Sequence, residues 1–256
     1  MSISIVVPSK FPDIFEEYRK SADRFASTQE KILVRDGHDI PNPPGWTTIQ
    51  APEGPFIYSR NVNLGLNQTS DDVLLMNDDC RFVSPDTVEA MEKILGACPD
   101  IGILSPKISG VVGNNLQSNV DRSVQYSDER LAFVCVLIRR SVIDRIGLLD
   151  ERFVGYGWDD SDYCRRAMAA GFKLACTNTA LVAHGHGSTT WSSSFSRTGI
   201  NGHHPDNVKI YEQKWGERHY TPIDPNAPPA KSRLNGSKYS TDGLTIDWYD
   251  SHPRRR

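Results

Sequence analysis

The sequence predicts an α/β fold with a mixed, mostly parallel sheet that is flanked by helices. Two observations carry this prediction: short β-branched runs alternate with stretches of helical periodicity, and an acidic turn, Asn77 to Asp79, comes directly after an apolar strand. The chain has 256 residues, of which 38% are hydrophobic and 24% charged. That length and composition indicate a globular chain large enough for a substantial core, not a disordered or fibrous one.

The first half of the chain alternates expected strands with expected helices. Strands are expected at residues 3–7, 31–34 and 73–76, and helices at residues 11–25 and from Ser84 onward. In the second helix Ser84 would be the N-cap and Pro85 the first helical residue. This βαβ rhythm favours parallel strands joined by crossover helices.

The second half continues the alternation with shorter elements. The expected elements are a strand at 132–139, a short helix opened by a capping box at Ser141 and ended by Gly147, a helix at 159–170 ended by Gly171, and strands at 173–177 and 181–183. Beyond Tyr220 prolines come close together, and residues 222–256 are expected to form a Pro-rich polar tail.

Charge and cysteine content narrow the class of protein. The formal net charge of -3 argues against broad electrostatic binding to nucleic acid. The five cysteines are odd in number and form no CxxC pair, so we expect a reduced, cytoplasmic chain without a zinc site. The first residues lack the pattern of a signal peptide, and no apolar run is long enough to span a membrane.

The first motif that could carry chemistry is the acidic turn after the third strand. Asn77, Asp78 and Asp79 follow an apolar run directly, and ligands of open α/β sheets bind beyond the carboxyl ends of strands. Adjacent carboxylates are hard oxygen ligands that suit Mg²⁺ or Mn²⁺ shared with a diphosphate. Judged alone, the same residues fit a solvated acidic turn equally well.

The second motif opens the helix expected at 159–170. Two glycines, Tyr156 and Trp158 precede three carboxylates within four residues, among them Asp159 and Asp160. A helix N-terminus favours ionised carboxylates, so one of them could act as a general base at neutral pH. Ordinary capping by Asp159 is the structural alternative, but three acids exceed what capping requires.

A third motif and two isolated residues are the remaining candidates for metal or ligand binding. His184 and His186 lie in a Gly-rich loop after a strand, where imidazole could complete a carboxylate metal site. Asp36 could accept a hydrogen bond from a nucleobase or merely shape its turn, and Arg60 could neutralise phosphate or be a surface charge. Walker A, GxGxxG and GxSxG patterns are absent, which removes the common phosphate-loop and serine-hydrolase interpretations.

In this order the motifs resemble those of an inverting glycosyltransferase with the GT-A fold, most similar to glycosyltransferase family 2. The resemblance covers roughly residues 3–190 and rests on the segments SIVVPS, LVRDG, SRNVNLGL, LLMNDD, LDERFVGYGWDDSDYCRRAMAAGF and LVAHGHGS. The fifth segment is the most specific. LVRDG departs from the usual pattern, because Arg35 stands where the family commonly has the first of two acids.

The resemblance implies a role for each matched residue. Contacts with the nucleotide sugar are implied for Ser9, Asp36, Arg60, Asn61 and Asp78. Metal binding is implied for Asp79 together with His184 or His186, of which His184 is favoured by its position. Asp160 would be the catalytic base, Asp159 would orient the acceptor, and Trp158 and Tyr156 would form the wall of the acceptor site. It also implies that residues 1–105 form the nucleotide-sugar-binding half and residues 106–221 the acceptor-binding and catalytic half of one domain.

The implied reaction moves a sugar from a nucleotide-diphosphate sugar, by default a UDP-sugar, to an acceptor hydroxyl. Nine of the 32 acids fall at 71–79 and 150–162, so a bridging Mn²⁺ or Mg²⁺ is expected to hold the diphosphate. The acceptor stays open among a glycan, a small molecule, a protein and a modified nucleic-acid base. The alternatives from other classes are a metal-dependent nucleotidyltransferase and a catalytically inactive sugar-binding domain.

Overall fold

A 10-stranded mixed sheet forms the centre of the protein. The structure is a computed structural model that describes residues 2–37, 39–110, 114–155, 157–185 and 205–216, with the backbone of 248–249. The strands are β1 (Ile3–Ser9), β2 (Glu30–Arg35), β3 (Thr47–Gln50), β4 (Asp72–Met76), β5 (Cys80–Phe82), β6 (Ile101–Gly110), β7 (Gln125–Ser127), β8 (Cys135–Ile138), β9 (Lys173–His184) and β10 (Trp248–Tyr249). The helices are α1 (Pro12–Phe25), α2 (Tyr58–Leu66), α3 (Thr87–Ala97), α4 (Asn115–Asn119), α5 (Arg140–Ile146), α6 (Asp159–Ala169) and α8 (Pro205–Trp215).

The strand order places the carboxyl ends of the first strands at one edge. The order is β10-β7-β9-β6-β8-β4-β1-β2-β3, and β5 pairs with β9 off this path. The strands β1, β2, β3 and β4 are mutually parallel, whereas β8 runs antiparallel between β4 and β6. The residues that follow β1, β2 and β4 therefore meet at the same edge of the sheet.

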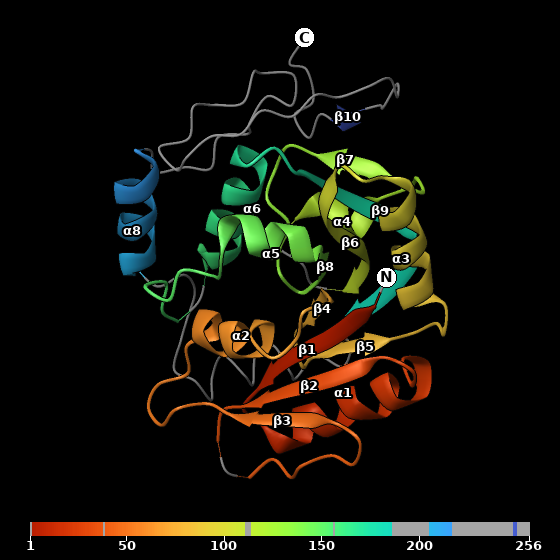
Figure 1. Cartoon of the computed structure of the whole chain (residues 1–256), viewed down its shortest axis with the longest axis vertical. Helices are drawn as coiled ribbons and strands as arrows, with labels where there is room; N and C mark the ends of the chain where they lie inside the picture. Colours follow the sequence, from red (N-terminus) through yellow and green to blue (C-terminus); the bar gives the residue numbers. More distant parts are fainter. Residues whose placement is uncertain are drawn as a thin grey trace.

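Helices cover both faces of the sheet, as Figure 1 shows. On one face, Phe15 and Tyr18 of α1 and Met91 of α3 join a cluster of buried strand residues. On the other face, Leu66 of α2 and Tyr163 of α6 belong to a second cluster, which also takes in residues of α4 and α5. The predicted α/β class with a flanked, mostly parallel sheet is confirmed.

Most of the expected elements are present, but two helix starts were wrong. We expected Ser84 as an N-cap, yet α3 begins at Thr87, and the Ser84 hydroxyl accepts the Asp86 N–H at 3.3 Å in the turn before it. We expected a capping box at Ser141, yet α5 begins one residue earlier, at Arg140. The Asp72 carboxylate accepts the Arg140 N–H at 2.7 Å, so a residue distant in sequence caps this helix.

The two strands expected at 173–177 and 181–183 are parts of one strand, β9. Its pairing with β6 shifts register between Pro106 and Lys107, which pair with Thr177 and Leu181. The intervening residues form an irregularity of one strand, not a turn between two. No helix in the part of the chain that the structure describes has the length and apolar character needed to cross a bilayer.

Candidate active site

The predicted nucleotide-binding residues gather at the carboxyl edge of β1, β2 and β4. In the register, Val6 of β1 pairs with Leu75 of β4, so Ser9 lies level with the turn that follows Met76. The Ser9 hydroxyl accordingly donates to Asp78 Oδ2 at 2.6 Å. Removal of Asp78 from water, reinforced by the charge of Asp79, raises the pKa of Asp78 to about 7, although the Ser9 hydrogen bond opposes this.

Asp36 forms a second polar cluster one strand further along the same edge. Asn61 Nδ2 donates to Asp36 Oδ2 at 2.8 Å, and an Arg60 guanidinium nitrogen lies 3.2 Å from the same oxygen. Lys10 Nζ lies 3.6 Å from Asp36 Oδ1. Because Arg60 and Asn61 are in the first turns of α2, this helix delivers them to the end of β2. The structure thus brings together three of the residues that the sequence analysis singled out separately.

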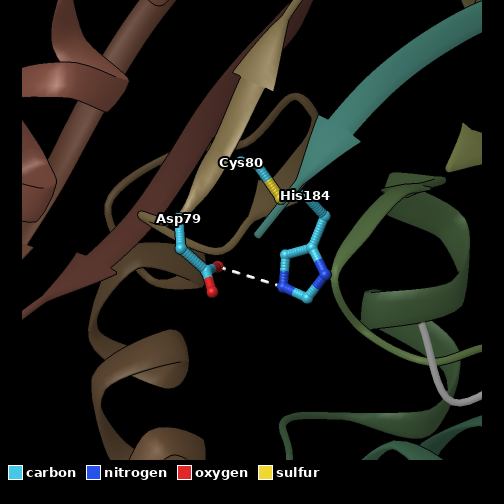
Figure 2. Close-up of side chains that lie close together, drawn as sticks. All are labelled: Asp79, Cys80 and His184. Carbon is cyan, nitrogen blue, oxygen red and sulfur yellow. Dashed lines mark ion pairs between the residues drawn. The ribbon is translucent and has the colours of Figure 1, made fainter. Parts of the chain in front are cut away.

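Asp79 and His184 meet where β5 and β9 pair. Cys80 lies opposite His184 in the antiparallel register, and His184 Nε2 lies 3.1 Å from Asp79 Oδ1. Figure 2 shows the Asp79 and His184 side chains pointing toward one another. Both side chains are mostly buried, with exposed fractions of 13% for Asp79 and 5% for His184. Of the two histidines considered, the structure therefore places His184 beside the acidic turn, whereas His186 lies outside the described residues.

Cys80 completes a group whose ligand atoms lie within 4.8 Å of one another, together with Asp79 and His184. The Cys80 side chain is fully buried, and its thiol donates to the Val134 carbonyl oxygen at 3.2 Å. Burial, with the charge of Asp79, raises the pKa of this thiol well above its ordinary value. Cys80 thus packs in the core beside the pair, with its thiol bound to a backbone carbonyl.

The Asp79–His184 pair has the donor set and spacing of a divalent cation site. Two ligands bound at about 2.1 Å and at a right angle lie about 3 Å apart, close to the spacing of this pair. Carboxylate oxygen and imidazole nitrogen are both ligands that divalent cations take in proteins. The neighbouring Asn77 adds a buried Oδ1 that has no hydrogen-bond partner among the described residues. The residues therefore fit a cation that is shared with a ligand.

The acidic turn of α6 is preceded by a left-handed residue. Trp158 is the N-cap of α6 and has φ 77°, the single positive value at a non-glycine position in the described chain. Gly155 and Gly157 also have positive φ values, so the segment before the helix depends on residues that tolerate this conformation. Tyr156 lies outside the described residues. Asp159 and Asp160 directly follow this left-handed residue, in the first turn of α6.

Asp159 and Asp160 have different surroundings. Arg130 donates to Asp160 Oδ2 at 3.0 Å, and the Ser161 N–H donates to Asp160 Oδ1 at 2.6 Å. For Asp159, removal from water, with the charge of Asp160 added, raises the pKa to about 7. The Asp160 carboxylate is thus bound by the Arg130 guanidinium, whereas removal from water has the largest effect on the pKa of Asp159.

Tyr58 links the two acidic regions. Its hydroxyl donates to the Phe133 carbonyl oxygen at 3.0 Å. Burial raises the pKa of Tyr58 well above its ordinary value, and the charges of Asp159, Asp160 and Asp79 raise it further. Close to Phe133 in the chain, the Val134 carbonyl oxygen accepts the Asn77 N–H at 2.9 Å, and Arg130 donates to Asp160 at 3.0 Å. Residues 130–134 therefore contact both acidic regions.

Two contributions could not be found from sequence. Arg130 carries no local signal for its contact with Asp160, because it lies 30 positions away in the chain. Asp162, counted above in the acidic cluster, is fully buried away from the site and pairs with Arg166 at 2.9 Å. Only the first two acids of the α6 turn are therefore candidates for chemistry.

Comparisons with known proteins support the fold. No family model matches the chain. Over 155 residues the chain is 24% identical to the uncharacterized protein y4gI of Sinorhizobium fredii, a match that covers 51% of this chain and 17% of that protein. The chain thus spans about a sixth of the length of that curated relative.

Solved structures resemble the chain more extensively. GalNAc-T7, crystallised with UDP, GalNAc and Mn²⁺, has a TM-score of 0.58 and 12% identity over 72% of this chain and 44% of that one. TarS of S. aureus, residues 1–349, has a TM-score of 0.55 and 15% identity over 72% of this chain and 60% of that one. Another structure of S. aureus TarS has a TM-score of 0.55 and 13% identity, over 83% of this chain and 42% of that one. These neighbours are glycosyltransferases, and the chain shares their GT-A fold.

Proposed function

We propose that the protein is an inverting glycosyltransferase of the family 2 type that moves a sugar from a nucleotide-diphosphate sugar to an acceptor hydroxyl. The observation that carries the proposal is the Asp79–His184 pair, 3.1 Å apart, at the carboxyl edge of a GT-A sheet. Residues 130–134 contact the sheet edge through Val134 and the acidic turn of α6 through Arg130, which supports a donor site and a base that lie near one another. GalNAc-T7 was crystallised with UDP and Mn²⁺, which makes these two the first probes for this chain.

Donor binding would use the three clusters of the sheet edge. Asp36 has both oxygens near donors of Lys10, Arg60 and Asn61, and its remaining lone pairs could accept a nucleobase N–H. Asp78, fixed by Ser9, would accept a ribose or sugar hydroxyl. Asp79 and His184 would hold Mn²⁺ or Mg²⁺, which when bound offsets the negative charge of the departing nucleoside diphosphate.

Asp160 would act as the base that receives the acceptor proton. Arg130 donates to its Oδ2 at 3.0 Å and the Ser161 N–H donates to its Oδ1 at 2.6 Å, so two hydrogen bonds hold this carboxylate in place at the start of α6. The acceptor oxygen would then attack the anomeric carbon on the face opposite the diphosphate, and the bond to the diphosphate would break. Asp159 and Trp158 would orient the acceptor from the same turn.

The substitution Asp160→Asn tests this assignment. It preserves size but removes the proton acceptor, so transfer, or hydrolysis with water as acceptor, should fall by about 10²–10⁴-fold. Binding of UDP in the presence of Mn²⁺ should stay near the wild-type value, because the donor contacts lie at the sheet edge. Release of UDP from a panel of UDP-sugars with Mn²⁺ measures the rate, and calorimetry measures the binding.

Asp144→Asn is the matched control, since Asp144 is an exposed acid on α5 that pairs with Arg140. It should leave the rate unchanged. An Asp160→Asn protein that releases UDP at the wild-type rate would refute the base assignment. Release of pyrophosphate from a nucleoside triphosphate would instead indicate a nucleotidyltransferase, and binding without any release of UDP would indicate an inactive sugar-binding domain.

A further inference from the structure

Helix α8 is attached to α6 by a network of charged and aromatic side chains. Trp215 Nε1 and Lys214 Nζ each donate to the buried Asp162 carboxylate of α6 at 2.9 Å. The Arg165 guanidinium of α6 lies 4.5 Å from the centre of the Trp215 ring. The end of α8 is therefore anchored on the helix that begins with the two candidate catalytic acids.

The start of α8 contacts the backbone of the loop before α6 through one side chain. Asn207 is 1% exposed. Its Nδ2 donates to the carbonyl oxygens of Val154 and Gly157, each at 2.8 Å, and its Oδ1 accepts the Val154 N–H at 3.2 Å. One buried amide thereby satisfies backbone groups of Val154 and Gly157, neither of which belongs to a strand or helix.

The residue after this loop is Trp158, the left-handed N-cap of α6. Its carbonyl oxygen accepts the Asp162 N–H at 2.9 Å, which is the first hydrogen bond of the helix. Its ring lies 4.8 Å from the ring of Tyr211, which is one turn beyond Asn207 on α8. Asn207 therefore holds the backbone leading into Trp158, and Tyr211 packs against its ring.

We propose that Asn207 is a positioning residue for the transfer step. It fixes the backbone of Val154 and Gly157, and through them the left-handed turn that positions Trp158, Asp159 and Asp160. This inference rests on the proposed function, in which these three residues serve the acceptor. A displacement of about 1 Å in a reacting group can lower a rate about 100-fold, so losing this amide should act on turnover more than on donor binding.

The test compares Asn207→Ala and Asn207→Asp with the wild type in the full chain. Aspartate keeps the size of the side chain and an oxygen that accepts the Val154 N–H, but it loses the N–H groups that donate to the Val154 and Gly157 carbonyl oxygens. If the alanine variant fails to fold, the aspartate variant still tests the role of these donors. Asn119→Asp is the matched control, because Asn119 Nδ2 donates to the Asn115 carbonyl on the exposed side of another helix. Hydrolysis of a UDP-hexose with Mn²⁺, calorimetry with UDP and Mn²⁺, and amide hydrogen exchange are measured for each.

Per folded molecule, both Asn207 variants should show kcat lowered about 100-fold, with the KM for the UDP-hexose and the Kd for UDP near wild type. Exchange at the Val154 amide should rise in Asn207→Ala, while amides of β4 keep their protection. A wild-type kcat in both variants would overturn the positioning role and leave the proposed function intact. A wild-type protein that neither binds UDP with Mn²⁺ nor hydrolyses any UDP-hexose would overturn the proposed function, and unchanged exchange at Val154 would separately overturn the fixing of the loop.

Discussion

At the scale of single residues, neighbouring carboxylates differ because their partners differ. Asp160 is bound to Arg130, whereas removal from water dominates at Asp159 and raises its pKa to about 7 from an ordinary 3.8. Asp150 shows the opposite effect. Hydrogen bonds from Arg152, and then from Lys214, hold the pKa of Asp150 well below its usual range. These two acids should therefore affect stability in opposite directions as the pH changes.

The direction in which each acid changes stability with pH depends on whether the folded or the unfolded state binds its proton more tightly. For Asp159 the folded state does, so its contribution to stability falls as the pH rises from about 4 to about 7. Asp159→Asn should raise the Tm at pH 8 and leave it nearly unchanged at pH 4. For Asp150 the folded state binds the proton less tightly, so its contribution is present above its ordinary pKa of 3.8 and is lost as the pH falls below it.

Asp150→Asn is the matched control and should lower the Tm at pH 8. Thermal unfolding monitored by circular dichroism at pH 4 and pH 8 gives both values. A lowered Tm for Asp159→Asn at pH 8 would mean that this carboxylate is stabilised by a partner rather than destabilised by the loss of water.

Sequence reasoning found residues whose signal is local. Asp78 and Asp79 follow an apolar strand, and Asp159 and Asp160 open a helix, so each pair could be located without a structure. Other contributions depend on the tertiary fold. Arg130 contacts Asp160, which is 30 positions away in the sequence, and Asn207 contacts Val154, which is 53 positions away. Contacts between residues so far apart in the chain produce no local sequence pattern.

At the scale of elements, α2 packs closely enough on β1 to require a glycine. A Cβ added to Gly65 would overlap with Val6 Cγ1 and would also approach Val34 Cγ2 at 3.3 Å. Both valines are fully buried strand residues that have little room to move. Gly65 therefore sets how closely the helix that carries Arg60 and Asn61 approaches the sheet.

Gly65→Ala should destabilise the protein by about 1–3 kcal/mol, because overpacking outweighs the better helix propensity of alanine. Gly96→Ala in α3 is the matched control. Nothing lies within 4 Å of a Cβ there, so the same substitution should stabilise by up to about 1 kcal/mol. Urea unfolding measures both free energies. Equal effects of the two substitutions would show that helix propensity alone decides.

The elements that sequence reasoning located have strong apolar runs. Every residue of β4 and β8 is buried, and both strands were expected, although β8 is shorter than predicted. The four-residue β3 has no buried residue, and α2 mixes polar with apolar side chains, so neither was foreseen. The start of α5 could not be predicted because its capping carboxylate comes from Asp72, at the start of another strand.

At the scale of the whole molecule, the placement of charge matters more than its sum. The net charge is -3, and nine of the 32 acids lie at 71–79 and 150–162. The structure separates these nine by role. Asp71 accepts from Ser2, Asp72 caps α5, Glu151 accepts from Asn63, and Asp150 and Asp162 bind Lys214 of α8. The pairs Asp78–Asp79 and Asp159–Asp160 are left for the candidate site, so the acidic regions serve both to assemble the fold and to form that site.

We propose above all that the sheet edge holds a nucleoside diphosphate together with a divalent cation. Calorimetric titration of UDP into the protein, with Mn²⁺ and then with EDTA, tests it most directly. We expect binding with Mn²⁺, little or none with EDTA, and an affinity at least about tenfold weaker in Asp79→Asn. No binding of UDP with Mn²⁺, or an equal affinity with and without the cation, would contradict the account.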